Sequence, residues 1–284
     1  MKTAICGISF PPGIEPEETF RIAKDAGFDG IEPPFAADGP VSLTSSEDDL
    51  RRYRDAADQA GLDIPSVTGG LYWGTPFTSD DPDVRARALD IARAHLKAAS
   101  VLGADTVLLV PGVVHAFFVE NCPVVRYDHA YERSLAAMKE LAPLAEELDV
   151  HIGVENVWNK FLLSPLEMAR FVDEVGSDRI GCYFDVGNVV PFGYPEHWIE
   201  VLGRRIRKVH VKDFKAEASV TSMAGFVDLL QGDVNWPAVM TALAEVGYDG
   251  YLTAEMIPHY THRPVQRIYN TGASLHALLE AYSG

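Results

Sequence analysis

Four short apolar runs decide the fold, because each carries a carboxylate or an imidazole near its carboxyl end: HIGVEN (151–156), IGCYFD (180–185), IRKVHVKD (206–213) and GYLTAEM (250–256). Buried strands of parallel sheets have this apolar character. An acidic or imidazole side chain at the end of such a strand is poorly solvated unless a cation lies beside it. The four runs therefore predict one divalent ion bound by four side chains: Glu155, Asp185, His210 and Glu255.

The spacing of these four residues indicates consecutive strands of one barrel. Successive members are 30, 25 and 45 residues apart, and one strand with its connecting helix takes about 30 residues or more. An open doubly wound sheet places its ligands at a single switch point, whereas a closed sheet directs several strand ends at one centre. No GxGxxG motif follows the first strand, which disfavours a dinucleotide site.

The rest of the chain also alternates strands and helices. Apolar runs predict earlier strands at 3–9, 30–33, 63–67 and 106–110. Amphipathic stretches predict helices at 14–26, 46–60, 83–102 and 126–148, and a helix after each later strand. Strict alternation implies parallel strands with helical crossovers. We therefore predict an α/β fold, a (β/α)₈ TIM barrel, with residues 1–284 as a single domain.

Composition narrows the class of partner. The chain has 284 residues, of which 47% are hydrophobic, and about 250 residues are typical of such a barrel. A formal net charge of −17 disfavours nucleic acid and anionic membranes as partners. Neither a signal peptide nor an apolar run of about 20 residues is present, so we expect a cytoplasmic protein. The cysteines, which predict no disulfide framework or zinc knuckle, are Cys6, Cys122 and Cys182.

Several motifs resemble the sugar phosphate isomerase/epimerase superfamily of xylose-isomerase-like TIM barrels: GVENVWNKF, CYFDVGNVV, KVHVKDF and LTAEM. The resemblance covers nearly the whole chain. Ketose 3-epimerases of this superfamily bind Mn²⁺ or Co²⁺ through a Glu, Asp, His, Glu quartet, and both glutamates also transfer protons. The resemblance thus implies Mn²⁺, with Co²⁺, Mg²⁺ or Zn²⁺ as alternatives, and makes Glu155 and Glu255 the catalytic residues. We also expect a homo-oligomer, either a dimer or a tetramer.

The reaction that the resemblance implies is 3-epimerisation of a ketose or ketose phosphate. One glutamate removes the C3 proton, a metal-stabilised cis-enediolate forms, and the other glutamate returns a proton to the opposite face. Enzyme alternatives are an aldose–ketose or hydroxypyruvate-type isomerase and a keto-inositol dehydratase or isomerase. A catalytically inactive, metal-dependent sugar-binding subunit is an alternative from another class. The apurinic endonucleases of the superfamily need further His ligands, and Asn188 stands at one of those positions.

The chain departs from the ketose 3-epimerases outside the quartet. Those enzymes usually have Pro after the first metal Glu, His three residues after the metal Asp, and Arg beyond the metal His. Here the corresponding residues are Asn156 and Asn188, with only Lys212 and Lys215 beyond His210. These changes leave the metal ligands intact and leave open which sugar is bound and whether it is phosphorylated.

Five residues near the predicted strand ends are candidate substrate contacts: Asn188, Lys212, Trp158, His115 and Glu32. Each has a structural alternative, such as a turn residue, an ion pair or a cover over the barrel mouth. Tyr72, Trp73 and Phe77 predict a lid or a loop packed on the barrel. Residues 214–236 predict an irregular loop over the site. Two arginines beyond the last strand either bind a phosphate or are solvated: Arg263 and Arg267.

Overall fold

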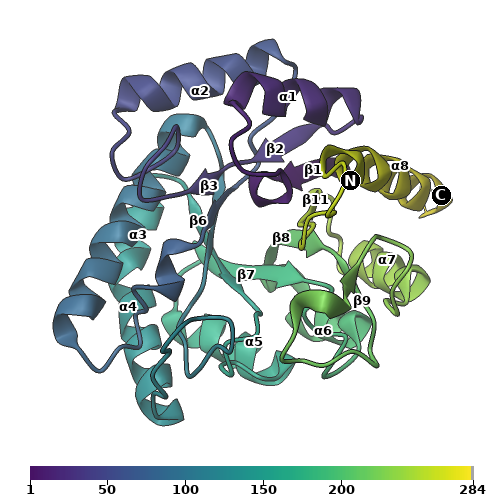
Figure 1. The fold of residues 1–284 in the computed structure, drawn as a ribbon. Helices are drawn as coiled ribbons and strands as arrows, with labels where there is room; N and C mark the ends of the chain where they lie inside the picture. The colour runs from purple at the N-terminus through teal and green to yellow at the C-terminus, as the bar shows by residue number, and fades with distance from the viewer. Residues whose placement is uncertain (283–284) are drawn as a thin grey trace.

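The computed structural model describes residues 1–282 as parallel strands enclosed by helices (Figure 1). The strands of the main sheet are β1 (Lys2–Cys6), β2 (Gly30–Glu32), β3 (Pro34–Phe35), β4 (Val67–Gly69), β5 (Thr106–Leu109), β6 (His151–Glu155), β7 (Ile180–Asp185), β8 (Ile206–Val211) and β11 (Tyr251–Ala254). Their order is β2-β1-β11-β8-β7-β6-β5-β4-β3, and every pair is parallel. This arrangement confirms the predicted TIM barrel.

Strands β2 and β3 together occupy one strand position, and this interrupted strand closes the barrel. They are separated only by Pro33, which has no N–H to donate to a neighbouring strand. β2 pairs with β1, and β3 pairs with β4. Backbone hydrogen bonds from Ile31 N to Asp63 O (2.9 Å) and from Thr68 N to Pro33 O (3.0 Å) continue the pairing on the β4 side. Closure directs all the strand carboxyl ends to one rim.

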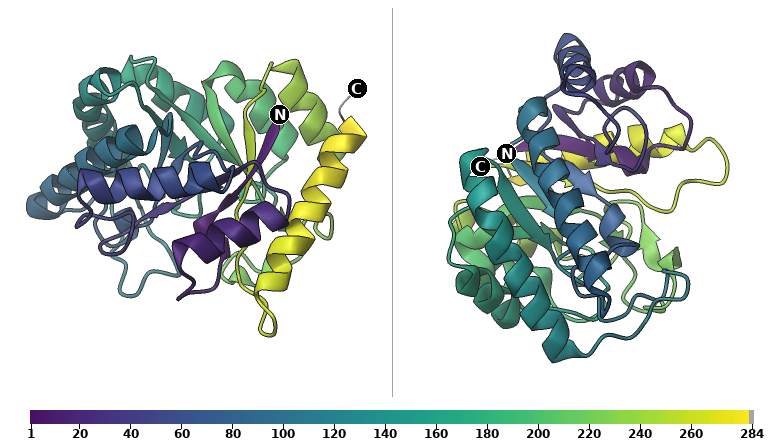
Figure 2. Two further views of the ribbon diagram at one scale, coloured as in Figure 1. Left: turned by 90° about the horizontal axis from the view of Figure 1, so that it is seen from above. Right: turned by 90° about the vertical axis from the view of Figure 1, so that its left-hand side faces the viewer.

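Eight α-helices form the outer layer of the described residues (Figure 2). They are α1 (Pro16–Asp25), α2 (Glu47–Gln59), α3 (Pro82–Leu102), α4 (Tyr127–Glu147), α5 (Pro165–Val175), α6 (Pro195–Leu202), α7 (Trp236–Glu245) and α8 (Val265–Tyr282). Their amino ends are well defined by local chemistry. Ser46 and Asp49 form a capping box on α2, and five helices have Pro in the first turn. No helix within residues 1–282 is long and apolar enough for a membrane span.

Two predictions are corrected, one about the bounds of a strand and one about a connecting segment. The strand expected at 63–67 is instead β4, which begins at Val67, because Pro65 cannot donate to a ladder. The segment 214–236 is not simply irregular. It contains the antiparallel ribbon of β9 (Asp213–Phe214) and β10 (Phe226–Val227), and a 3₁₀ helix at Met223–Gly225.

The aromatic segment after β4 packs into the barrel rather than forming a lid. Tyr72 and Phe77 are 1% exposed, and their rings stack with centroids 5.2 Å apart. The Tyr72 hydroxyl lies 3.1 Å from Nδ1 of the buried His95. Trp73 is half-buried against Phe118. Because both rings are buried and the Tyr72 hydroxyl has a hydrogen-bond partner, this segment is held in place. It is therefore the loop packed on the barrel, which was the alternative to a lid.

Candidate metal centre

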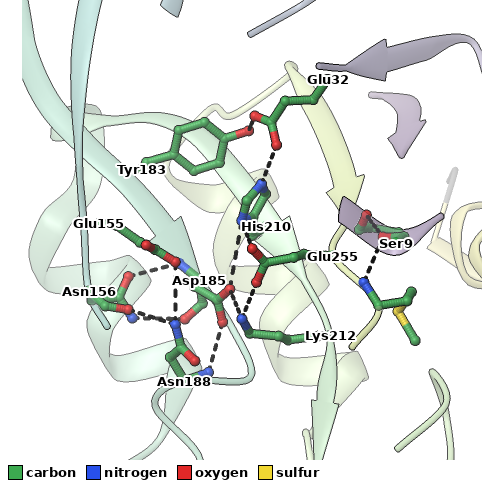
Figure 3. Close-up of polar contacts among 12 residues, drawn as sticks. Ser9, Glu32, Glu155, Asn156, Tyr183, Asp185, Asn188, His210, Lys212 and Glu255 are labelled. Atoms are coloured by element: carbon green, nitrogen blue, oxygen red, sulfur yellow. Dashed lines mark hydrogen bonds and ion pairs between the residues drawn. The ribbon is translucent and has the colours of Figure 1, made fainter. Parts of the chain in front are cut away.

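The four predicted metal ligands converge at the carboxyl-terminal rim of the barrel (Figure 3). Glu155 ends β6, Asp185 ends β7, His210 lies in β8, and Glu255 follows β11 directly. One ligand atom from each residue lies within 4.8 Å of every other. Metal–ligand distances of about 2.0–2.4 Å place opposite ligand atoms up to about 4.8 Å apart. The cluster therefore has the size of a single divalent-cation site.

Unsatisfied buried atoms support the fit to a cation. Nδ1 of His210 is buried and has no hydrogen-bond partner within the described chain, whereas Oδ2 of Asp185 is buried and has only an ion pair with Lys212, at 2.9 Å. Nδ1 of His210 is 3.8 Å from Asp185 Oδ2 and 3.8 Å from Glu255 Oε1. A buried imidazole nitrogen without a hydrogen-bond partner is rare in proteins, and a cation beside Nδ1 of His210 would supply the missing partner. Three carboxylates and one imidazole form a hard donor set that suits Mn²⁺, Mg²⁺, Co²⁺ or Zn²⁺.

Glu32 orients His210 from behind. The Nε2 atom of His210 lies 2.7 Å from Oε2 of Glu32, so Nε2–H donates to the carboxylate and Nδ1 faces the other ligands. Oε1 of Glu32 accepts from Ser66 Oγ (2.7 Å) and Tyr183 Oη (2.5 Å). Because Glu32 is fully buried and its oxygens are engaged in this way, the structure corrects its expected role from substrate contact to positioning residue.

Lys212, the residue directly after β8, enters the cluster. Its Nζ hydrogen bonds to Glu255 Oε2 and lies 2.9 Å from Asp185 Oδ2, although that second contact is an ion pair without hydrogen-bond alignment. The side chain is 4% exposed, and Nζ lies 5.0 Å from the Phe226 ring centroid. Lys215, by contrast, pairs with Asp233 at 3.6 Å near the surface. Of the two lysines, only Lys212 reaches the candidate site.

The two glutamates have opposite electrostatic environments. Burial raises the pKa of Glu155 well above its ordinary value, and the negative charge of Glu255 adds to this effect. Burial also disfavours ionisation of Glu255, but Lys212 and His210 outweigh it and hold the pKa of Glu255 below its ordinary value. Burial likewise raises the pKa of Asp185. A bound divalent cation would favour the ionised form of each carboxylate.

Two asparagines brace the strand ends beside the cluster. Asn156 donates from Nδ2 to Asp185 O and accepts at Oδ1 from Asp185 N, both at 2.8 Å. Asn188 donates from Nδ2 to Asn156 O at 3.0 Å and to Glu155 Oε1 at 3.4 Å. Trp158 Nε1 donates to Asn188 O at 3.0 Å. These bonds hold Glu155 and Asp185 in register at neighbouring strand ends.

Comparison with known proteins places this geometry in a family. A profile of the xylose isomerase-like TIM barrel family matches residues 20–279. The chain belongs to the xylose isomerase-like TIM barrel family. It is 26% identical over 210 residues to a 2-epi-5-epi-valiolone 7-phosphate 2-epimerase of Actinoplanes sp., covering 72% of this chain and 70% of that protein. It is 23% identical over 256 residues to the L-ribulose-5-phosphate 3-epimerase UlaE of Escherichia coli strain SE11, covering 88% and 85%.

The fold of the family is equally clear from solved structures. A D-psicose 3-epimerase from Clostridium cellulolyticum H10, solved with D-tagatose, superposes with a TM-score of 0.81 over 99% of both chains, at 17% sequence identity. At this identity the likeness concerns the barrel alone.

The other sequence-predicted residues lie at the same rim of this family barrel. His115 follows β5, and its Nδ1 is buried without a hydrogen-bond partner in the described chain. Arg267 is buried and pairs with Asp228 at 2.9 Å, so it is a structural ion pair. Sequence reasoning missed Tyr183, although it lies two residues before Asp185 on β7 and so shares its side of the strand. Ser66 lies at the end of a loop, where no strand periodicity indicates that its side chain faces the site.

Proposed function

We propose that this chain is a Mn²⁺-dependent sugar epimerase that inverts C3 of a ketose or ketose phosphate. One observation carries the proposal: Glu155 and Glu255 reach one buried candidate cation site from different strands, beside Asp185 and His210. Two relatives of this chain are themselves named as epimerases of phosphorylated substrates.

The positions of the two glutamates suit inversion. In the barrel, β7 and β8 lie between β6 and β11, so Glu155 and Glu255 approach the cluster from different sides. One carboxylate removes the proton from C3, and the other carboxyl group delivers a proton to the opposite face. A divalent cation, when bound, supplies positive charge opposite the oxygens on which negative charge develops.

Four further residues complete the proposed substrate site. Lys212 is placed to donate a charged hydrogen bond to a substrate oxygen beside Asp185 and Glu255. Asn188, Trp158 and His115 line the adjoining cavity and offer polar and aromatic contacts. Glu32 acts only through His210. The cytoplasmic location and the homo-oligomer expected from the sequence stay predictions.

Solvent-deuterium exchange tests this function and separates it from its alternatives. The protein is loaded with Mn²⁺ in D₂O, and a panel of free and phosphorylated ketoses is followed by NMR. We expect deuterium at C3 together with the C3 epimer. Deuterium at the neighbouring carbon of an aldose product indicates an isomerase, and loss of water indicates a dehydratase. Binding of a ketose without exchange of any carbon-bound proton contradicts the proposal and favours a sugar-binding subunit.

A further inference from the structure

A cavity beside the metal cluster is unusually apolar for a sugar site. Its volume is about 460 Å³, and ten of its fifteen lining residues are aliphatic or aromatic. Pockets that enclose a drug-sized ligand typically measure about 300–1,000 Å³. The rings of Phe117 and Phe192 lie 6.3 and 6.4 Å from the Trp158 ring, centroid to centroid. These three rings form an aromatic wall.

The cavity adjoins the candidate metal centre through two residues that belong to its lining and also contact the cluster. Asn156 and Asn188 line it and also hydrogen bond to Asp185 and Glu155. The Trp158 ring stacks on Phe226 at 5.0 Å, and the same Phe226 ring lies 5.0 Å from Nζ of Lys212. Trp158 and Phe226 therefore link the cavity lining to the lysine of the cluster.

The charge of the lining disfavours a phosphate in this cavity. Lys160 is its only basic residue other than His115, and it is exposed at the rim. Phosphate sites in proteins ordinarily present a helix amino terminus or several Arg and Lys donors. By contrast, apolar side chains remain uncovered at the mouth, where Phe192 is 67% and Leu163 is 63% exposed. An apolar ligand group would bury both side chains.

We propose that the substrate is a sugar-like α-hydroxy ketone with an apolar, ring-sized substituent, which this cavity holds while the hydroxy ketone faces the quartet. The proposal rests on the proposed function and specifies its substrate class. It distinguishes this chain from an enzyme of simple ketose phosphates. The occupant is a part of the substrate rather than a second protein, because the space is a hollow whose lining residues Asn156 and Asn188 also hydrogen bond to Asp185 and Glu155.

Four probes differ only in their substituent: D-fructose, D-fructose 6-phosphate, and the 1-O-benzyl and 6-O-benzyl ethers of D-fructose. Binding to the Mn²⁺-loaded protein is measured by calorimetry, which does not depend on turnover. We expect at least one benzyl ether to bind about tenfold or more tightly than D-fructose, since burying a phenyl ring contributes substantially to binding. We expect no such gain for the 6-phosphate. Tightest binding of the phosphate, or no gain for either ether, overturns the proposal.

A matched pair of double variants tests whether the tighter binding of the benzyl ether arises in this cavity. Phe192→Ala with Leu163→Ala removes two exposed residues of the cavity mouth. Tyr194→Ala with Leu166→Ala removes equally exposed neighbours outside it, which are 64% and 72% exposed. In the first variant, we expect the ratio of benzyl-ether affinity to D-fructose affinity to fall by about fivefold or more. In the second variant, we expect this ratio to stay as in the wild type. Equal losses, or no loss, overturn the proposal. Benzyl-selective binding without deuterium exchange contradicts epimerisation alone and leaves the cavity assignment standing.

Discussion

Oε2 of Glu32 lies 2.7 Å from Nε2 of His210, and this contact determines which nitrogen of the imidazole faces Glu155, Asp185 and Glu255. Burial opposes both charges. Nevertheless His210, with hydrogen bonds from Tyr183 and Ser66, lowers the pKa of Glu32 to about 2, and Glu32, with the charges of Glu255 and Asp185, raises the pKa of His210 to about 9. A carboxylate behind a metal-binding histidine makes the facing nitrogen a better ligand.

We expect Glu32→Gln to weaken Mn²⁺ binding by about 10- to 100-fold, because the amide keeps the shape but removes the charge that supports His210. Calorimetric titration of Mn²⁺ measures the change. Ser66→Ala is the matched control, since it removes a bond to the same carboxylate without changing its charge. Unaltered Mn²⁺ affinity in Glu32→Gln would show that Glu32 is only a packing residue.

Replacing either glutamate of the quartet tests its role in proton transfer. Glu155→Gln and Glu255→Gln each keep one ligand oxygen, so we expect measurable metal binding but loss of net epimerisation by about 10²- to 10⁴-fold. Because each carboxyl group serves one face, one variant should still exchange the C3 proton of one epimer. Deuterium uptake is measured from each epimer separately. Near wild-type interconversion by a metal-loaded variant contradicts the mechanism and points to Lys212 or His115.

Metal binding should stabilise the folded chain through the quartet. At free Mn²⁺ about 100 times the dissociation constant, the free energy of unfolding should rise by about 2.7 kcal/mol. His210→Ala should abolish this increase, whereas His115→Ala should retain it because His115 lies outside the cluster. Chemical denaturation with and without Mn²⁺ provides the measurement. A His210→Ala protein that Mn²⁺ stabilises as strongly as wild type would rule out the four-ligand site.

Buried His95 should make the metal-free protein sensitive to acid. Burial lowers the pKa of His95 to about 4 from its ordinary 6.5, so the unfolded chain binds a proton more readily than the folded chain. The stability that His95 contributes is present above pH 6.5 and is lost as the pH falls towards 4, by up to about 3 kcal/mol. His95→Gln should flatten this fall in urea denaturation curves. The exposed His262→Gln is the control, and identical slopes for all three proteins would refute the assignment.

The sequence by itself determined the barrel and the four side chains that cluster at its rim. Alternating strands and helices allow few parallel topologies, and acidic residues at the ends of apolar strands have few physical alternatives to a cation. Predicted bounds of the first four helices agree with the structure to within two residues. Local patterns sufficed here because periodicity and capping are properties of neighbouring residues.

Tertiary structure alone decided what surrounds the quartet. Glu32 and His210 are 178 residues apart, and they meet only because the barrel closes. Pairing of β8 with β11 brings Lys212 onto Glu255, and the ribbon of β9 and β10 packs against Trp158. An apolar cavity is likewise formed by side chains from several separate loops. Sequence patterns specify which side chains stand at strand ends, whereas contacts between distant loops depend on three-dimensional packing, which no local pattern encodes.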